Sequence, residues 1–471
     1  MRVLLIAATE RPAIERLVPA LATLVARGAT LEATPPAAQL LAAEGLACVA
    51  IDPGPALDAA LRGLDGGDLL IAPHAPGAPR TDPDVAAALA RALAAPDGPL
   101  LLVDVEAAGD LLAALAVGPT PAVREGLRQA ALAALAAALA GGPGLLPPAA
   151  PAPGSTAEWP ERALVVLERV RTFGHGENPH QRAAAYRRLG AAPGGPLAAP
   201  LAQGDEPTLN DLLDLDAGAR LVADLPAPSA AVIRHTDPIG VATAETTYGA
   251  FSRAVETDAA AATGAVVALN VAIDRATAAE IVAGSYEAVV APAVADDATR
   301  AILAGRRDLR VLLYAAHPPD APEMIEIDGA VLLQTRDHGA IERSELRVVT
   351  ERRPSLDELT DLLFAWRVVR HVRSNAIVVA RSGATLGIGA GQVNRRIAVD
   401  IALQRAADRA RGGVMASDAY FPFAEGITAA AAAGITAVVQ PGGSRRDAAA
   451  IEIADRMGLA MVFTGRRHYR R

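Results

Sequence analysis

The chain has 471 residues and a formal net charge of −9, and 52% of its residues are hydrophobic against 21% charged. This proportion supplies a large core and excludes an intrinsically disordered protein. The acidic pI of about 5.5, with no basic block before the last few residues, argues against general nucleic-acid binding through phosphate neutralisation. The single cysteine, Cys48, excludes an intrachain disulfide framework and a multi-cysteine metal site.

Residues 1–140 alternate short apolar runs with helical patterns. We expect strands at residues 2–8, 47–51, 69–72 and 100–103, and an amphipathic helix at residues 14–28. Strands that alternate with helices in this way indicate a parallel α/β sheet.

The apolar segments are too short for targeting or membrane functions. Glu10 and Arg11 interrupt the N-terminal apolar run before it reaches the length of a signal-peptide core. The longest apolar helical stretch, residues 130–140, falls short of the roughly 20 residues that cross a bilayer. We therefore expect a cytoplasmic protein with no membrane partner.

A Pro- and Gly-rich stretch divides the chain. It predicts a first domain at residues 1–140, a linker at residues 141–163 and a second α/β region at residues 164–471, large enough for two subdomains. There we expect strands at residues 230–234, 264–269, 289–292, 311–314 and 377–381, and a helix at residues 356–369. The segments VIRHTDPIGVA and AIVVARSGATLGIGAG echo each other weakly, as a duplicated unit would.

Two polar motifs of the second region are candidates for chemistry. GENPHQ, residues 176–181, crowds polar side chains around an Asn-Pro turn, although a polar surface turn is the alternative interpretation. RHTDPIG follows an apolar strand, so Arg234 and His235 stand at a strand end, where α/β enzymes commonly keep active groups. Histidine exchanges a proton near neutral pH and arginine holds anions, although a lone histidine is more often structural.

Two further motifs lie later in the chain. RSNAIVVARSGATLGIGAGQVNR contains Gly387, Gly389 and Gly391, which allow close backbone approach; a tight hairpin is the alternative, and no phosphate-binding P-loop is formed. ASDAYFPF concentrates Tyr420, Phe421 and Phe423 in a chain that is only 3% aromatic. This concentration favours a flat-ring binding site, with core packing as the alternative.

Found together in this order, GENPHQ, SNAIV, GIGAGQ and ASDAYFPF resemble the transformylase region of the bifunctional purine-biosynthesis enzymes. That family combines 5-aminoimidazole-4-carboxamide ribonucleotide (AICAR) formyltransferase with IMP cyclohydrolase. The resemblance covers about residues 164–471. It implies an α/β chain with a methylglyoxal-synthase-like N-terminal domain followed by a duplicated cytidine-deaminase-like region. It also implies 10-formyltetrahydrofolate as co-substrate, no metal, and a homodimer.

The resemblance also assigns roles to residues. His235 matches the catalytic histidine that helps to deprotonate the attacking amine, Asn375 matches an asparagine near the carboxamide, and Arg234 completes the catalytic set. Asp258 matches an acidic position in the folate-binding region. The substrate-binding set that the resemblance implies is Asn178, His180, Gln181, Arg395, Phe421, Pro422 and Phe423.

The chain departs from the family pattern at several positions. Arg234 stands where the family has lysine and Asp237 where it has asparagine, so we expect Asp237 to pair with Arg234. Gly174 and His175 replace an Arg-Tyr pair that helps to hold the substrate phosphate. The chain has no lysine at all, so the arginine at 234 can simply reflect composition.

The N-terminal domain has lost the family's phosphate-binding motifs. ATERPA, from Ala8, stands in place of Ser-Asp-Lys-Thr-Gly, and EATPPA, from Glu32, in place of Ser-Thr-Gly-Gly-Thr. Proline offers no backbone N–H to a phosphate. We therefore expect a degenerate cyclohydrolase domain.

Two functions follow. The first is formyl transfer to the amine of AICAR, or of a close aminocarboxamide analogue. The second is a catalytically silent homologue that binds a nucleotide or a folate. The presence of His235, Asn375 and Arg395 favours the enzyme, whereas the departures favour the silent homologue.

Overall fold

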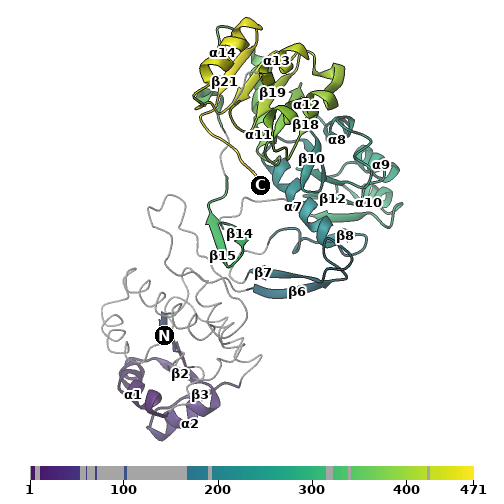
Figure 1. Cartoon of the computed structure of the whole chain (residues 1–471). Coiled ribbons are helices and arrows are strands. Elements are labelled where there is room, and N and C mark those ends of the chain that lie inside the picture. The colour runs from purple at the N-terminus through teal and green to yellow at the C-terminus, as the bar shows by residue number, and fades with distance from the viewer. Residues whose placement is uncertain are drawn as a thin grey trace. The chain divides into compact units, whose positions relative to one another are not determined.

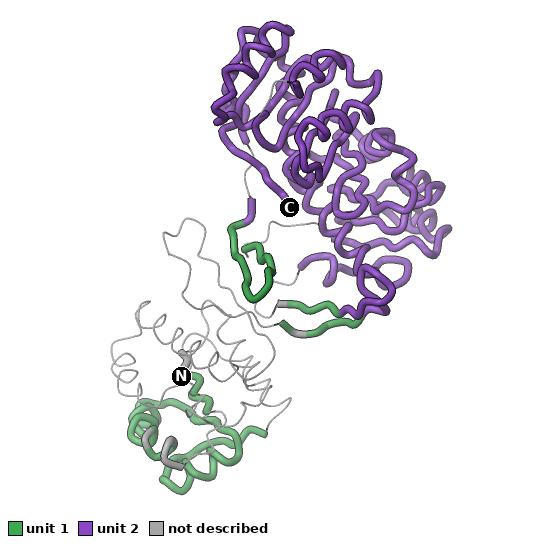
Figure 2. Tube along the Cα trace, in the orientation of Figure 1, with its two compact units in different colours: residues 1–172, 184–192, 320–335 green, residues 173–183, 193–319, 336–471 purple. Residues whose placement is uncertain are grey.

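A computed structural model describes residues 2–5, 11–52, 60, 69–71, 100–102, 167–188, 194–314, 322–337, 341–421 and 425–471. The chain divides into two compact units, coloured separately in Figure 2. The first unit contains residues 1–172, 184–192 and 320–335, and the second contains residues 173–183, 193–319 and 336–471. The expected linker at residues 141–163 lies outside the described residues, so the domain boundaries stay predictions.

The first unit contains a five-stranded parallel sheet with the order β3-β2-β1-β4-β5. Its elements are β1 (Arg2–Leu5), α1 (Arg11–Ala26), β2 (Thr30–Ala33), α2 (Pro35–Ala43), β3 (Val49–Ala50), β4 (Leu69–Ile71) and β5 (Leu100–Leu102). The predicted parallel α/β sheet is thus confirmed. Strand β2 was missed because Glu32 interrupts its short apolar run.

Two two-stranded sheets complete the described strands, one before the twelve-stranded sheet in the sequence and one between its two halves. One joins β6 (Leu167–Phe173) to β7 (Ala183–Arg188). The other is an antiparallel hairpin of β14 (Glu323–Ile327) and β15 (Ala330–Gln334).

The second unit is built on a twelve-stranded mixed sheet with the order β16-β21-β20-β19-β17-β18-β10-β9-β11-β12-β13-β8. Figure 1 labels some of its strands, among them β8, β10, β18 and β21. Its first half contains β8 (Leu201–Gln203), α7 (Leu209–Ala223), β9 (Ser229–Arg234), β10 (Asp237–Thr243), α8 (Thr247–Glu256), β11 (Val266–Leu269), α9 (Arg275–Ala283), β12 (Ala288–Ala291), α10 (Asp297–Leu303) and β13 (Arg310–Leu313). Its second half contains η2 (Arg343–Glu345), β16 (Arg347–Val348), α11 (Leu356–Val369), β17 (Ile377–Arg381), β18 (Ala384–Gly389), α12 (Arg395–Ala406), η3 (Ala407–Ala410), β19 (Val414–Ser417), α13 (Glu425–Ala432), β20 (Ala437–Gln440), α14 (Asp447–Arg456) and β21 (Ala460–Phe463).

The two halves repeat the same topology. Each has an edge strand, a helix, an antiparallel hairpin and then three strands connected by helices. The halves meet where β10 pairs with β18 in antiparallel fashion, with Ala242 opposite Ala384. Helices α7 and α11 both begin with a capping box, formed by Thr208 with Asp211 and by Ser355 with Glu358. The weak echo in the sequence falls on the two central hairpins of this repeat.

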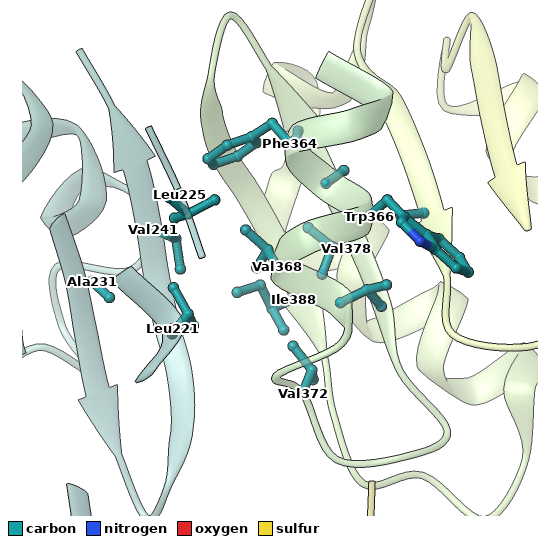
Figure 3. Packing of buried hydrophobic residues seen from close by; sticks show 14 of the residues in the cluster. Leu221, Leu225, Ala231, Val241, Phe364, Trp366, Val368, Val372, Val378 and Ile388 are labelled. Atoms are coloured by element: carbon teal, nitrogen blue, oxygen red, sulfur yellow. The ribbon is translucent and has the colours of Figure 1, made fainter. Parts of the chain in front are cut away.

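Helices cover both faces of this sheet. One core cluster packs α7 and α11 against one face of the sheet. Figure 3 shows part of this cluster, with Leu221 and Leu225 from the first half and Trp366 and Val368 from the second half. Helices α8 and α9 pack into a second cluster, and α12 to α14 into a third. None of the described helices is both long and apolar enough to cross a membrane.

Glycines let one helix of each half approach the sheet closely. A Cβ added to Gly240 would lie 2.0 Å from the carbonyl oxygen of Ala254 in α8, and one added to Gly387 would lie 2.1 Å from that of Ala402 in α12. Gly389 has the same property toward Ala398. The predicted close backbone approach is therefore correct for Gly387 and Gly389 and wrong for Gly391, where an added Cβ meets nothing within 4 Å.

We predict that Gly387→Ala lowers the free energy of unfolding by about 3 kcal/mol, because the methyl group must displace the α12 backbone. Chemical denaturation of the purified variant measures this loss. Gly174→Ala is the control, because a Cβ there meets nothing within 4 Å. A Gly387→Ala protein as stable as the control would contradict this account of the packing.

Candidate active site

The β9–β10 hairpin presents His235 at an exposed turn. Arg234 and Asp237 are paired across the hairpin, and His235 and Thr236 form the two-residue loop between them. Both loop residues have left-handed backbone, with φ values of 56° and 63°. Positive φ at both central positions is the signature of a type I′ turn, which Asn-Gly usually occupies. The sequence correctly places His235 at the end of a buried strand.

The carboxylate of Asp214, on α7, holds this turn. It accepts hydrogen bonds from the backbone N–H of His235 at 3.1 Å and of Thr236 at 2.6 Å. Burial raises the pKa of Asp214, an effect that the two amide hydrogen bonds partly offset. Sequence reasoning missed Asp214. The internal repeat carried the signal, because Asp361 precedes its own turn by the same 21 residues.

Asp237 fixes the hairpin to the second half. Arg373 donates to its carboxylate from the backbone N at 2.9 Å and from Nε at 2.6 Å, and its Nη2 donates to the His235 carbonyl at 3.2 Å. Nη1 of Arg470 lies 4.0 Å from Asp237 and donates to the Thr236 carbonyl at 3.1 Å. Arginines from the second half thus hold both the carboxylate and the carbonyls of the turn.

The expected ion pair between the side chains of Asp237 and Arg234 is wrong, although the two residues are opposite each other in the β ladder. Nη1 of Arg234 instead donates to the Thr263 carbonyl at 2.8 Å. Asp258 lies in the same loop, where its carboxylate accepts a hydrogen bond from the Ala261 amide at 3.1 Å. Its other oxygen pairs with Arg405 at 2.8 Å. Arg234 and Asp258 therefore both contact the loop of residues 258–263. The arginines next to the Asp237 carboxylate are Arg373 and Arg470.

Asn375 lies in a buried polar network with Arg395. Nη2 of Arg395 donates to Oδ1 of Asn375 at 2.6 Å, and Nη1 donates to Ser417 at 2.8 Å and to the fully buried Asp418. Nδ2 of Asn375 donates to the Gln392 carbonyl at 2.6 Å. Arg395 is only 6% exposed, and the network orients the Asn375 amide. Substrate contact by Arg395 stays a prediction.

The network is also tied to the His235 turn through neighbouring backbone. Ser374, which precedes Asn375, donates from its N–H to the Arg470 carbonyl at 2.8 Å. Its hydroxyl hydrogen-bonds to Asp418. The segment 373–375 therefore touches the His235 turn through Arg373 and the Arg395 network through Ser374 and Asn375.

The polar turn at residues 176–181 is stabilised from within. Gln181 Oε1 accepts from the backbone N–H of Asn178 at 2.9 Å and from its Nδ2 at 2.8 Å. Asn178, His180 and Gln181 are all exposed. Their predicted role in substrate binding stays a prediction.

The aromatic segment is divided between core and surface. Phe421 is 2% exposed and belongs to the core cluster beside α12 and α13, whereas Tyr420 is exposed. Pro422 and Phe423 lie outside the described residues. Core packing, the alternative interpretation, therefore describes Phe421, and contact of this segment with substrate stays a prediction.

A half-buried ion cluster lies where α7 and α11 end. Nε2 of His371 and Nη2 of Arg370 both bond to Oδ2 of Asp224. Burial alone would raise the pKa of Asp224, but these bonds outweigh it and lower that pKa to about 2. Burial, helped by the charges of Arg370 and Arg470, lowers the pKa of His371 despite the adjacent carboxylate.

No group of His, Cys, Asp and Glu side chains within the described ranges could hold a metal ion. The expectation of a metal-free reaction stays a prediction.

Comparison with known proteins decides the family. The sequence model of the family described as "AICARFT/IMPCHase bienzyme" matches residues 148–405. The chain belongs to the AICARFT/IMPCHase bienzyme family. The family resemblance seen in the sequence is thereby confirmed, and His235, Asn375 and Arg395 all lie within the matched range.

Several curated relatives named "Bifunctional purine biosynthesis protein PurH" are similar to this chain. The protein from Synechococcus elongatus is 46% identical over 313 residues, which are 66% of this chain and 61% of that protein. The protein from Cereibacter sphaeroides is 46% identical over 330 residues, which are 67% of this chain and 62% of that protein. The protein from Anoxybacillus flavithermus is 41% identical over 314 residues, 66% of this chain and 61% of the relative. The chain thus spans about six-tenths of the length of these relatives.

The half-buried His371 makes the free energy of unfolding depend on pH. Because the pKa of His371 lies below 6.5 in the folded state, the unfolded chain binds its proton first as the pH falls. We predict that His371 lowers the free energy of unfolding as the pH falls below about 6.5, with a contribution of at most about 1.4 kcal/mol per pH unit.

Denaturant unfolding at pH 7 and pH 5.5 measures this slope, and His371→Gln should flatten it. His180→Gln replaces an exposed histidine and should leave the slope unchanged. An unaltered slope in His371→Gln would show that other groups carry the pH dependence.

Proposed function

We propose that this chain transfers the formyl group of 10-formyltetrahydrofolate to the amine of AICAR, or of a close aminocarboxamide analogue, in purine or purine-like biosynthesis. The observation that carries the proposal is the exposed turn of His235, whose backbone is held by Asp214, Arg373 and Arg470. Such fixed geometry suits a positioned acid–base group. Membership of the family supports the same reaction.

The proposed chemistry follows from the weakness of the amine. Its lone pair is delocalised into the ring, so attack on the formyl carbon needs alignment and removal of a proton. His235 takes this proton as the new C–N bond forms and returns it to the folate nitrogen as the old C–N bond breaks. The Asn375 amide, oriented by Arg395, donates to the tetrahedral oxyanion. Arg234 is engaged by the carbonyls of residues 261 and 263, so we assign it to holding the loop that contains Asp258.

We also propose the finer fold assignments. The strand order of the first unit supports a methylglyoxal-synthase-like domain. The repeated hairpin-and-parallel-strand topology of the second unit supports a duplicated cytidine-deaminase-like region. A homodimer suits the exposed apolar residues at the start of α12, where Val393 is 96% exposed and Ile397 is also exposed. The homodimer and the cytoplasmic location stay predictions.

We predict that His235→Ala lowers the turnover of formyl transfer by about 10²–10⁴-fold, the usual contribution of a positioned general base. A folate-dependent absorbance assay with AICAR measures it. Ser382→Ala, at the corresponding turn of the second half, is the control and should keep full turnover. Unchanged turnover in His235→Ala would rule out this mechanism. A wild-type protein that binds ribonucleotide or folate without turnover would instead identify the silent homologue.

The described β2–α2 junction of the N-terminal unit supports the loss of cyclohydrolase activity. EATPPA lies at the junction of β2 and α2, where Pro35 and Pro36 take the first two helical positions. The N-terminal amides of a helix commonly bind phosphate, and proline removes them. This junction therefore offers fewer donors than a nucleotide phosphate needs.

We predict little or no IMP formation above the uncatalysed rate when the formylated ribonucleotide is supplied. The absorbance of IMP follows the reaction, and a sample without protein gives the uncatalysed rate. Turnover on the order of 1 s⁻¹, a common enzyme rate, would show that the unit binds the nucleotide by other groups.

A further inference from the structure

We propose that Asp214 is a positioning residue that sets the direction of His235 by holding its turn in left-handed backbone. The inference rests on the proposed formyl transfer only for its kinetic consequence. Asp214 lies on α7 and belongs to none of the motifs discussed for the family above.

The turn needs an external restraint. Both His235 and Thr236 have positive φ, a conformation that residues other than glycine rarely adopt. Thr236 is β-branched, for which this backbone is especially unfavourable. Two such residues in succession persist only where the surroundings fix them.

Asp214 supplies that restraint from a rigid base. Its Oδ2 accepts from the His235 amide at 3.1 Å and its Oδ1 from the Thr236 amide at 2.6 Å, so both carboxylate oxygens are used. The next residue, Leu215, is fully buried in the core that α7 shares with α11. Because α7 is anchored in the core, the Asp214 side chain holds the turn in a fixed position relative to that core.

The second half contains the same arrangement, but its turn consists of Ser382 and Gly383. Asp361, on α11, accepts from the amides of Ser382 at 2.7 Å and Gly383 at 2.8 Å. There the second turn residue is glycine, which adopts positive φ freely. The turn of the second half is thus stable by its own composition, whereas the His235 turn depends on Asp214. The repeat provides a matched control within one molecule.

We expect Asp214→Asn to lower kcat for formyl transfer by about 10- to 100-fold, because an amide can accept only one of the two hydrogen bonds and small misplacements of a reacting group are costly. KM for the ribonucleotide should change less than threefold. Asp361→Asn removes an equivalent bond and should leave kcat unchanged. Equal kcat values for Asp214→Asn and wild type would overturn the proposal.

A rescue separates positioning from general destabilisation. Thr236→Gly copies Gly383 into the first turn and should restore kcat to within about threefold of wild type in the Asp214→Asn background. Thr236→Gly alone should keep wild-type turnover. A double variant no faster than Asp214→Asn would show that Asp214 acts otherwise than through the turn backbone.

Hydrogen–deuterium exchange tests the same restraint without activity. The amides of His235 and Thr236 should exchange at least tenfold faster in Asp214→Asn than in wild type or in Asp361→Asn. If the wild-type protein transfers no formyl group, the proposed function fails while this measurement still decides whether Asp214 holds the turn. Unchanged exchange would overturn the inference even in an active enzyme.

Discussion

The junction between β10 and β18 is the contact on which the second unit depends. Here the two halves of the repeat become one sheet, and a buried threonine reinforces the junction. The hydroxyl of Thr385 accepts from the Val241 amide at 2.9 Å, and the Thr385 carbonyl accepts from the hydroxyl of Thr257 at 2.8 Å. A buried network of this kind is stable only when each member is satisfied. Because His235 comes from one half and Asn375 from the other, this junction sets their relative positions.

In this chain without lysine, the arginines near the His235 turn each make several directed hydrogen bonds. Arg373 binds a carboxylate and a carbonyl at once, and Arg395 reaches three side chains from one guanidinium. A planar guanidinium with five donors can make several directed bonds, whereas an ammonium acts as a compact point charge. The arginines of this unit therefore act as multi-point connectors between segments, and replacing them with lysine would conserve charge but lose geometry.

The sequence predicts local features well and distant contacts poorly. Apolar runs predicted several strands of both sheets, among them β9, β11, β12, β13 and β17, because burial demands them, and helix 356–369 was predicted with its observed limits. His235 was placed at a strand end for the same reason. The partner of Asp237 was predicted wrongly because Arg373 lies 136 residues away, and only the pairing of the two halves brings it near. Asp214 was missed because a carboxylate in a helix has no distinguishing pattern until the repeat is aligned.

The contacts of Arg470 bear on when the site can form during synthesis. Its guanidinium bonds to the carbonyls of Thr236 and His371, and its own carbonyl accepts from Ser374. On the ribosome the hairpin of His235 emerges more than two hundred residues before Arg470 does. The first half can therefore fold and present its histidine while the turn still lacks this arginine. The complete arrangement is available only after Arg470 has been synthesised, so shorter nascent chains contain His235 without the contacts of this arginine.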